Sequence, residues 1–260
     1  MTQLRLVDLV VNGRDRPRLQ VDALTLSPGI TVVVGKNGAG KSTLLDVVAG
    51  VLPPASGQVR LDDDLVFLMA PATRARRIAS LGQRPRAAPW LLVSERIAQG
   101  LIPRCGVGAS SSPAVRSAVV AIAARLGIEA ELDRPLVDLS GGQQQRAHIA
   151  RALVDEEASV VVLDEPMSGL DESGAAMVAR LLQARAQAGV VVVVSVHDLG
   201  LAASLAGRVL GIEAGAIVVD SEGLVGVRAA APLLGEGLRV VEVDGAIGVL
   251  RTIAPGSPPG

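Results

Sequence analysis

The nine residues from 35 to 43 have the types and spacing that most directly indicate chemistry in this chain. They read Gly-Lys-Asn-Gly-Ala-Gly-Lys-Ser-Thr and satisfy the pattern G-x-x-x-x-G-K-[ST], which binds phosphate when it follows a strand and opens a helix. The glycines let backbone N–H groups curve around a polyphosphate, Lys41 can reach its β- and γ-phosphates, and Ser42 can ligate Mg²⁺. We expect contacts to the nucleotide from Gly35, Asn37, Gly38, Ala39, Gly40, Lys41, Ser42 and Thr43. Lys36 lies outside the fixed pattern and is expected to face solvent.

Two neighbouring carboxylates follow an apolar strand later in the chain. Residues 160–163 read Val-Val-Val-Leu, and Asp164 and Glu165 come directly after them. The carboxyl ends of strands are where α/β sheets bind ligands. Beside a phosphate-binding loop, Asp164 suits the outer coordination shell of Mg²⁺ and Glu165 suits the polarisation of an attacking water. Taken alone, such an Asp-Glu pair would equally fit the N-cap of a helix.

A third string, residues 139–146, forms a second place where an anion could bind. It reads Leu-Ser-Gly-Gly-Gln-Gln-Gln-Arg. Ser140 is a suitable N-cap, and the two glycines expose backbone N–H groups at the start of a helix that should run to about Leu153. One nucleotide does not need two such helix N-termini on one chain, so this string indicates more than a general nucleotide-binding protein.

Together, the phosphate loop, the Asp-Glu strand and the string at 139–146 closely resemble the main motifs of the ABC ATPase family. In that family the signature motif of one subunit closes over the γ-phosphate of ATP held by the other subunit. The resemblance therefore implies a head-to-tail dimer of two copies with two composite sites, ATP and Mg²⁺ as cofactors, and ATP hydrolysis. The implied signature contacts to ATP come from Ser140, Gly141, Gly142 and Gln143.

The remaining landmarks of the family fall in the family's order. Gln83 matches the Q-loop glutamine, which touches Mg²⁺ or the attacking water and senses the transmembrane partner. Asp171, in Ser-Gly-Leu-Asp, matches the D-loop that reaches the opposite site, and His197 matches the switch histidine that contacts the γ-phosphate. The resemblance thus implies catalytic roles for Lys41, Gln83, Glu165 and His197 and metal contacts from Ser42, Gln83 and Asp164. A lone histidine after a strand would more often be structural, and His148, which matches no motif, is expected on the surface of its helix.

One landmark of the family is missing. Most members have an aromatic residue upstream of the phosphate loop that stacks on adenine, but Phe67 and Trp90 both lie downstream. The corresponding segment, residues 12–18, reads Asn-Gly-Arg-Asp-Arg-Pro-Arg. Our hypothesis is that an arginine of this loop, or only an aliphatic contact, packs on the base, because guanidinium planes stack on aromatic faces. Selectivity for the base should then be weak.

Alternating strands and helices must position these residues. Strands are predicted over the apolar runs Leu4–Val11, Leu19–Leu26, Ile30–Val34, Val160–Leu163 and Val190–Val196. Apolar strands that alternate with helices imply a parallel sheet covered on both faces. The family resemblance implies the same α/β class: a P-loop NTPase (RecA-like) core with a mostly parallel sheet, an antiparallel β subdomain and an inserted α-helical subdomain.

A hairpin and a C-terminal extension complete the predicted elements. The hairpin strands are Gly57–Asp62 and Leu65–Met69, and the acidic turn between them is expected to be solvated rather than to bind a metal, because adjacent carboxylates point different ways and repel. The C-terminal elements are a helix and a second hairpin before a loose tail: Ala229–Leu234, Arg239–Val243, Gly248–Ile253 and Ala254–Gly260.

We expect one ABC ATPase domain over residues 1–260. Its P-loop core with the antiparallel subdomain should comprise residues 1–83 and 158–222. The helical signature subdomain should comprise residues 84–157, and the C-terminal extension and tail residues 223–260.

The composition excludes several other classes of protein. The 260 residues carry a net charge of −1 and contain one Phe, one Trp and no Tyr, so neither a basic surface nor stacking platforms for nucleic acid are available. The longest apolar runs are far shorter than a membrane-spanning helix, and no export signal is visible, so a cytoplasmic location is expected. The single cysteine, Cys105, excludes an internal disulfide.

Further strings resemble one group of ABC proteins, the importers of iron-siderophores, haem and cobalamin. They are residues 75–83, residues 93–100, the Leu-Asp-Glu-Pro-Met at 163–167 and the C-terminal helix and hairpin. This resemblance implies separate transmembrane permease subunits, a substrate-binding protein and a place at the cytoplasmic face of the membrane. Trp90 could contact the permease or pack as an ordinary side chain. The alternatives to an importer ATPase are the motor of an ABC exporter and a non-transport ABC ATPase such as that of Fe–S assembly.

Overall fold

The computed structural model describes residues 1–14, 16–83, 87–108, 112–205, 207–235, 238–243 and 246–251. The tail expected from Ala254 to Gly260 lies outside these residues, as does the end of the second strand predicted for the C-terminal hairpin.

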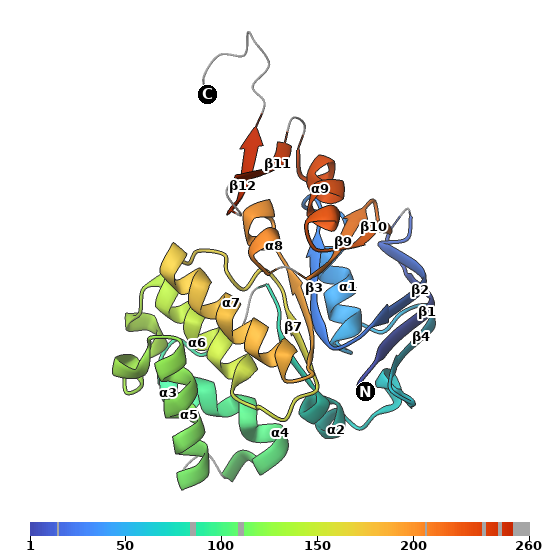
Figure 1. Cartoon of the computed structure of the whole chain (residues 1–260). Coiled ribbons are helices and arrows are strands. Elements are labelled where there is room, and N and C mark those ends of the chain that lie inside the picture. The colour runs from blue at the N-terminus through green and yellow to red at the C-terminus, as the bar shows by residue number, and fades with distance from the viewer. Residues whose placement is uncertain are drawn as a thin grey trace.

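One mixed β-sheet organises the described part of the chain (Figure 1). Its strand order is β5–β4–β1–β2–β10–β9–β3–β8–β7–β6. The parallel region contains β3 (Gly29–Val34), β6 (Ile78–Leu81), β7 (Val160–Leu163), β8 (Val191–Ser195) and β9 (Arg208–Glu213). The antiparallel region contains β1 (Leu4–Val11), β2 (Leu19–Leu26), β4 (Ser56–Leu61) and β5 (Asp64–Leu65). Strand β10 (Ala216–Glu222) connects the two regions, because it pairs antiparallel with β9 and parallel with β2. The predicted α/β class is confirmed, and β1, β2 and β7 have the predicted bounds.

Both faces of the parallel strands are buried, because successive side chains of a strand point to opposite faces. In β8, Val192 and Val194 belong to the core beneath most of the helices. Val191 and Val193 instead belong to the core shared by α1 (Lys41–Val48) and the antiparallel strands. All four valines are completely buried. The uninterrupted apolar run is therefore explained by helices on both faces of the sheet.

The other helices lie on the face of the sheet opposite α1 or at its end (Figure 1). Their bounds are α2 (Pro71–Arg77), α3 (Val93–Ala98), α4 (Ile102–Cys105), α5 (Pro113–Arg125), α6 (Gly141–Leu153), α7 (Glu172–Gln187), α8 (Leu199–Leu205) and α9 (Gly223–Leu234). Helices α3, α4, α5 and α6 form a group beside α7, and α3 packs against both α5 and α6. In the described ranges, none of the helices combines the length and apolar character needed to cross a membrane.

The hairpin at the outer edge of the sheet differs from its prediction in the second arm. The strand predicted over Leu65–Met69 is wrong, because pairing stops at Leu65 and the chain enters the 3-10 turn Val66–Leu68. Val66 is completely buried in the core around α1, and Phe67 packs against the same core. Burial of these side chains therefore directs the chain over the face of the sheet instead of along its edge.

The acidic turn of this hairpin pairs with an arginine. Arg77, at the end of α2, forms ion pairs with Asp62 and Asp64. Among the described residues, no group of three or more His, Cys, Asp or Glu side chains could hold a metal ion. The turn is thus a charged link between β4 and α2.

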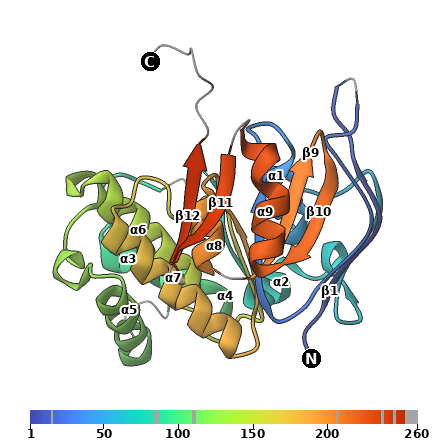
Figure 2. The same cartoon turned by 45° about the horizontal axis from the view of Figure 1, so that its top comes forward.

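The sequence patterns did not reveal every element. Strand β6 was not predicted, although it pairs in parallel with β7 at the edge of the sheet and places Gln83 two residues beyond its end. Strand β9 was also missed, and it joins the parallel region to β10. Helix α9 begins six residues before its prediction. Strands β11 (Leu238–Val243) and β12 (Ala246–Arg251) form the expected second hairpin, which packs beside α8 and α9 (Figure 2).

Candidate nucleotide-binding site

The phosphate loop (residues 35–43) connects the end of β3 to the start of α1. Gly40 is the N-cap of α1 with φ +118°, and Gly38 has φ +80°, a region that favours glycine. Lys41 is buried, and its Nζ donates to the carbonyl oxygens of Gly35 at 2.8 Å and Lys36 at 3.3 Å. The side chain thus crosses the inside of the loop, whereas Lys36 is exposed as predicted. The ammonium group lies where a phosphate held by the loop would meet it.

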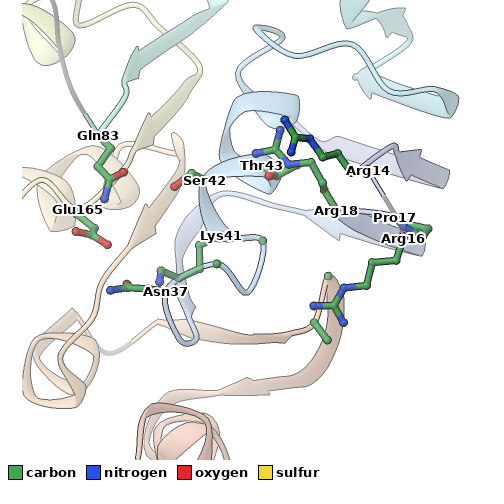
Figure 3. Close-up of a pocket in the computed structure, with 15 residues that line it drawn as sticks. Arg14, Arg16, Pro17, Arg18, Asn37, Lys41, Ser42, Thr43, Gln83 and Glu165 are labelled. Atoms are coloured by element: carbon green, nitrogen blue, oxygen red, sulfur yellow. The ribbon is translucent and has the colours of Figure 1, made fainter.

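A cavity of about 750 Å³ opens above this loop (Figure 3). Segments far apart in the sequence line it: residues 13–14 and 16–18, the phosphate loop, the starts of the segments that follow β6 and β7, and the β9–β10 turn. The lining residues are Gly13, Arg14, Arg16, Pro17, Arg18, Asn37, Gly38, Gly40, Lys41, Ser42, Thr43, Gln83, Glu165, Ala214 and Gly215. The fold therefore brings the phosphate loop together with Gln83 and Glu165.

The two carboxylates after β7 occupy different environments. Glu165 has φ +48° and lines the cavity, whereas Asp164 is only 5% exposed and lies behind it. Ser195, at the end of β8, joins them: its hydroxyl donates to Asp164 Oδ1 and its Oγ accepts the backbone N–H of Glu165 at 2.8 Å. Sequence reasoning gave Ser195 no role. The available signal was a single hydroxyl at the end of an otherwise all-valine strand.

The signature motif caps α6 as its sequence predicts. The Oγ of Ser140 accepts the N–H of Gln143 at 3.3 Å, and the side chain of Gln143 accepts the N–H of Ser140 at 3.0 Å, which is a capping box. Ser140 and Gly141 are exposed, and Gly142 and Gln143 are partly exposed. None of the four lines the cavity above the phosphate loop of the same chain.

Asp171 and His197 also lie apart from the cavity lining. Asp171 is the N-cap of α7, and its Oδ1 accepts the N–H of Gly174 at 2.9 Å. This hydrogen bond, with a second from Ser173, lowers the pKa of Asp171, so the carboxylate is charged at neutral pH. His197 is exposed two residues after β8. The fold therefore assembles the P-loop side of the site and leaves the signature motif, Asp171 and His197 outside the lining of the cavity.

The prediction for His148 is wrong. His148 is 9% exposed, and its Nδ1 accepts a hydrogen bond from Arg96 Nε at 3.1 Å. Burial, together with the charges of Arg96 and Arg151, lowers its pKa to about 4. The cause is the packing of α3 on α6, which covers a face that the α6 sequence alone could not identify as buried.

The arginine-rich loop supplies the side chains at the other end of the cavity. Arg14, Arg16 and Arg18 line it, together with Pro17. Neither aromatic residue of the chain does so: Phe67 packs on the antiparallel core, and Trp90 is 76% exposed near the start of α3. The side chains of Arg14, Arg16, Pro17 and Arg18 are therefore the candidates for a contact with the base, because neither aromatic side chain lines the cavity.

The fold and the site define a P-loop nucleotide-binding protein. The family model described as ABC transporter matches residues 19–168, more than half of the chain. The chain belongs to the ABC transporter family.

Several similar curated proteins are import ATP-binding proteins. The molybdenum import ATP-binding protein ModC of Mycobacterium tuberculosis is 40% identical over 224 residues, which cover 84% of this chain and 59% of ModC. The hemin import ATP-binding protein HmuV of Rhodopseudomonas palustris is 37% identical over 198 residues, covering 74% of this chain and 71% of HmuV. The chain thus spans about three fifths of the length of ModC.

Solved structures confirm the fold. A dimeric ATP-binding cassette in a post-hydrolysis state with ADP and Pi superposes with a TM-score of 0.76 at 24% identity, covering 84% of this chain and 98% of that one. A nucleotide-free ATP-binding cassette from an ABC transporter gives the same TM-score at 22% identity, covering 88% and 95%.

Proposed function

We propose that the chain is the ATP-hydrolysing subunit of an ABC importer that takes up a metal chelate or vitamin of the iron-siderophore, haem or cobalamin type. The observation that carries ATP hydrolysis is the cavity in which the phosphate loop faces Gln83 and Glu165. Import is supported by the names of the relatives, which include hemin, molybdenum and ribose import proteins. The haem type is favoured because the HmuV proteins are matched over most of their length and because the strings at 75–83 and 93–100 resemble that group.

In this proposal the chain's own groups bind the phosphates and position the attacking water. Backbone N–H groups at the start of α1 and the Lys41 ammonium bind the β- and γ-phosphates. Glu165 accepts a hydrogen bond from the attacking water and polarises it. Ser195 fixes the backbone of Glu165 through the 2.8 Å hydrogen bond from its N–H. His197 contacts the γ-phosphate when the site is closed.

The oxygen donors around the cavity fit Mg²⁺, which takes few protein ligands and keeps phosphate oxygens and waters. Ser42 and Gln83 both line the cavity and would hold the ion directly. Asp164 lies behind them and would contact it through water. When bound, the ion neutralises charge on the phosphate oxygens.

A second copy of the chain completes the site. The second copy contacts the γ-phosphate of the ATP held by the first copy through Ser140, Gly141, Gly142 and Gln143. Asp171 reaches across the same interface between the two copies. These residues are supported as the closing surface by their exposure and by their position outside the cavity of their own chain. The remaining partners are transmembrane permease subunits and a substrate-binding protein, with the chain at the cytoplasmic face of the membrane.

The Glu165→Gln substitution tests this function. We expect ATP hydrolysis to fall by at least about a hundredfold, because the water loses its base, while ATP binding stays intact. ATP should then hold the variant as a dimer in size-exclusion chromatography. Glu172→Gln, at an exposed first-turn position of α7, is the matched control and should hydrolyse ATP at the normal rate. Rapid turnover by Glu165→Gln would contradict the proposal.

Reconstitution with candidate permease subunits tests the transport role. Haem, cobalamin or an iron-siderophore, presented with its binding protein, should stimulate ATP hydrolysis and accumulate inside proteoliposomes. Stimulation by molybdate or ribose instead would keep the importer and reject the proposed substrate type. Co-purification with soluble Fe–S assembly partners, and with no permease, would reject transport itself.

A further inference from the structure

The two ends of the cavity have different chemistry. Gln83 and Glu165 lie at one end, where hydrolysis would occur, and the phosphate loop lies between the ends (Figure 3). A nucleoside triphosphate bound with its γ-phosphate toward Glu165 must point its base the other way. That direction leads to residues 13–14 and 16–18 and to the turn between β9 and β10, which line the opposite end.

Backbone hydrogen bonds connect the segments that line this opposite end of the cavity. The N–H of Gly215, in the β9–β10 turn, donates to Ala39 O at 2.8 Å, and its own carbonyl accepts the N–H of Gln20 at 2.8 Å. A Cβ placed on Gly40 would lie 3.1 Å from the carbonyl oxygen of Arg18, so the arginine loop and the phosphate loop are in direct contact. The base would therefore meet a surface whose position is fixed relative to the phosphates.

The three arginines at this end differ in their surroundings. Burial and Asp164 raise the pKa of Asp46 in α1, and the charge of Arg18 opposes this, which places Arg18 near that acid. Figure 3 shows the side chain of Arg16 extending in a different direction from those of Arg14 and Arg18.

Arg16 stands at the junction of two hollows. It lines the main cavity and also an adjoining hollow of about 180 Å³, and Ala214 lines both with it. Its side chain is exposed, and within the described residues no hydrogen bond or ion pair holds its guanidinium group. A planar group is thus free to lie along a flat ligand at the nucleoside end.

We propose that Arg16 is the platform for the nucleobase, with its guanidinium plane stacked on the ring in place of an aromatic side chain. Guanidinium groups stack on π-systems without reading the hydrogen-bonding edge of the base. The described side chains at this end of the main cavity, from Arg14, Arg16, Pro17, Arg18 and Ala214, include no carboxylate and no amide. The site therefore accepts adenine and guanine with similar affinity. This inference rests on nucleotide binding at the phosphate loop, which is part of the proposed function.

Equilibrium titration of the full chain with ADP, GDP and pyrophosphate, each with Mg²⁺, tests the proposal without turnover. For the unmodified chain, ADP and GDP should bind with dissociation constants within about threefold of each other, and both should bind more tightly than pyrophosphate. Arg16→Ala should weaken ADP and GDP binding by about two- to fivefold, the size expected for an exposed stacked cation, and should leave pyrophosphate binding unchanged.

Two further variants separate stacking from charge. Arg16→Lys keeps the charge and loses the plane, so it should weaken ADP binding as much as Arg16→Ala does. Arg16→Tyr restores a stacking surface without charge and should recover ADP affinity.

The outcomes that would overturn the proposal are distinct from a failure of the function. Wild-type affinity in Arg16→Lys, or equal weakening of ADP and pyrophosphate in Arg16→Ala, would make Arg16 a simple phosphate attractant. A preference for ADP over GDP greater than about tenfold would reject weak base selectivity. If the unmodified chain bound no pyrophosphate and no nucleotide, the proposed function itself would fail.

Discussion

Lowering the pH from 7 to 4 should destabilise this protein through His148. In the folded state His148 accepts a hydrogen bond from Arg96 and has a pKa of about 4, whereas an unfolded histidine has a pKa near 6.5. Above pH 6.5 the side chain is neutral in both states and has no effect on stability. As the pH falls from 6.5 to 4, His148 becomes protonated in the unfolded state but stays largely neutral in the folded state, so the free energy of unfolding decreases. The full difference in pKa corresponds to about 3 kcal/mol, a large part of a typical domain stability.

Urea unfolding at pH 7 and pH 4 measures this loss. His148→Gln keeps an acceptor within reach of Arg96 but cannot take up a proton. Its stability should fall about 2–3 kcal/mol less between the two pH values than that of the unmodified chain. The other histidine of the chain, His197, is exposed, and His197→Gln should lose as much stability as the unmodified chain. If His148→Gln and the unmodified chain lost equal stability between pH 7 and pH 4, the reasoning would be refuted. The carboxylates that both proteins share would then explain all of the acid sensitivity.

Two further substitutions test the site. Ser195→Ala should destabilise the fold by about 1–3 kcal/mol and lower kcat, because the partly buried N–H of Glu165 loses its acceptor. Ser204→Ala, at an exposed serine of α8, is its control. Equal denaturation curves for the two variants would count against a stabilising role of the hydrogen bonds that Ser195 makes with Asp164 and Glu165. Lys41→Ala should lose ADP affinity in equilibrium titrations, because its ammonium lies inside the phosphate loop, whereas Lys36→Ala should keep it. Equal ADP affinities in the two lysine variants would show that any positive charge near the loop binds phosphate, whether or not it lies inside the loop as Lys41 does.

Short-range patterns in the sequence were sufficient for the motifs and for several elements. The N-cap predicted at Ser140 forms, in a capping box with Gln143 that spans four residues. The turn glycine Gly40 and the strands β1, β2 and β7 likewise follow from spacing and periodicity. These features depend on backbone conformation and on the alternation of side chains along a strand, which act over a few neighbouring residues.

Tertiary packing decided what those patterns could not. His148 is buried only because α3 covers that face of α6, and the predicted second arm of the first hairpin ends early because Val66 is drawn into the core. Ser195 joins Asp164 to Glu165 only because β7 and β8 lie side by side in the sheet. The sequence by itself determined which groups could bind a nucleotide. Only the three-dimensional packing determined which of them share one cavity, because burial and proximity depend on elements that are distant in the chain.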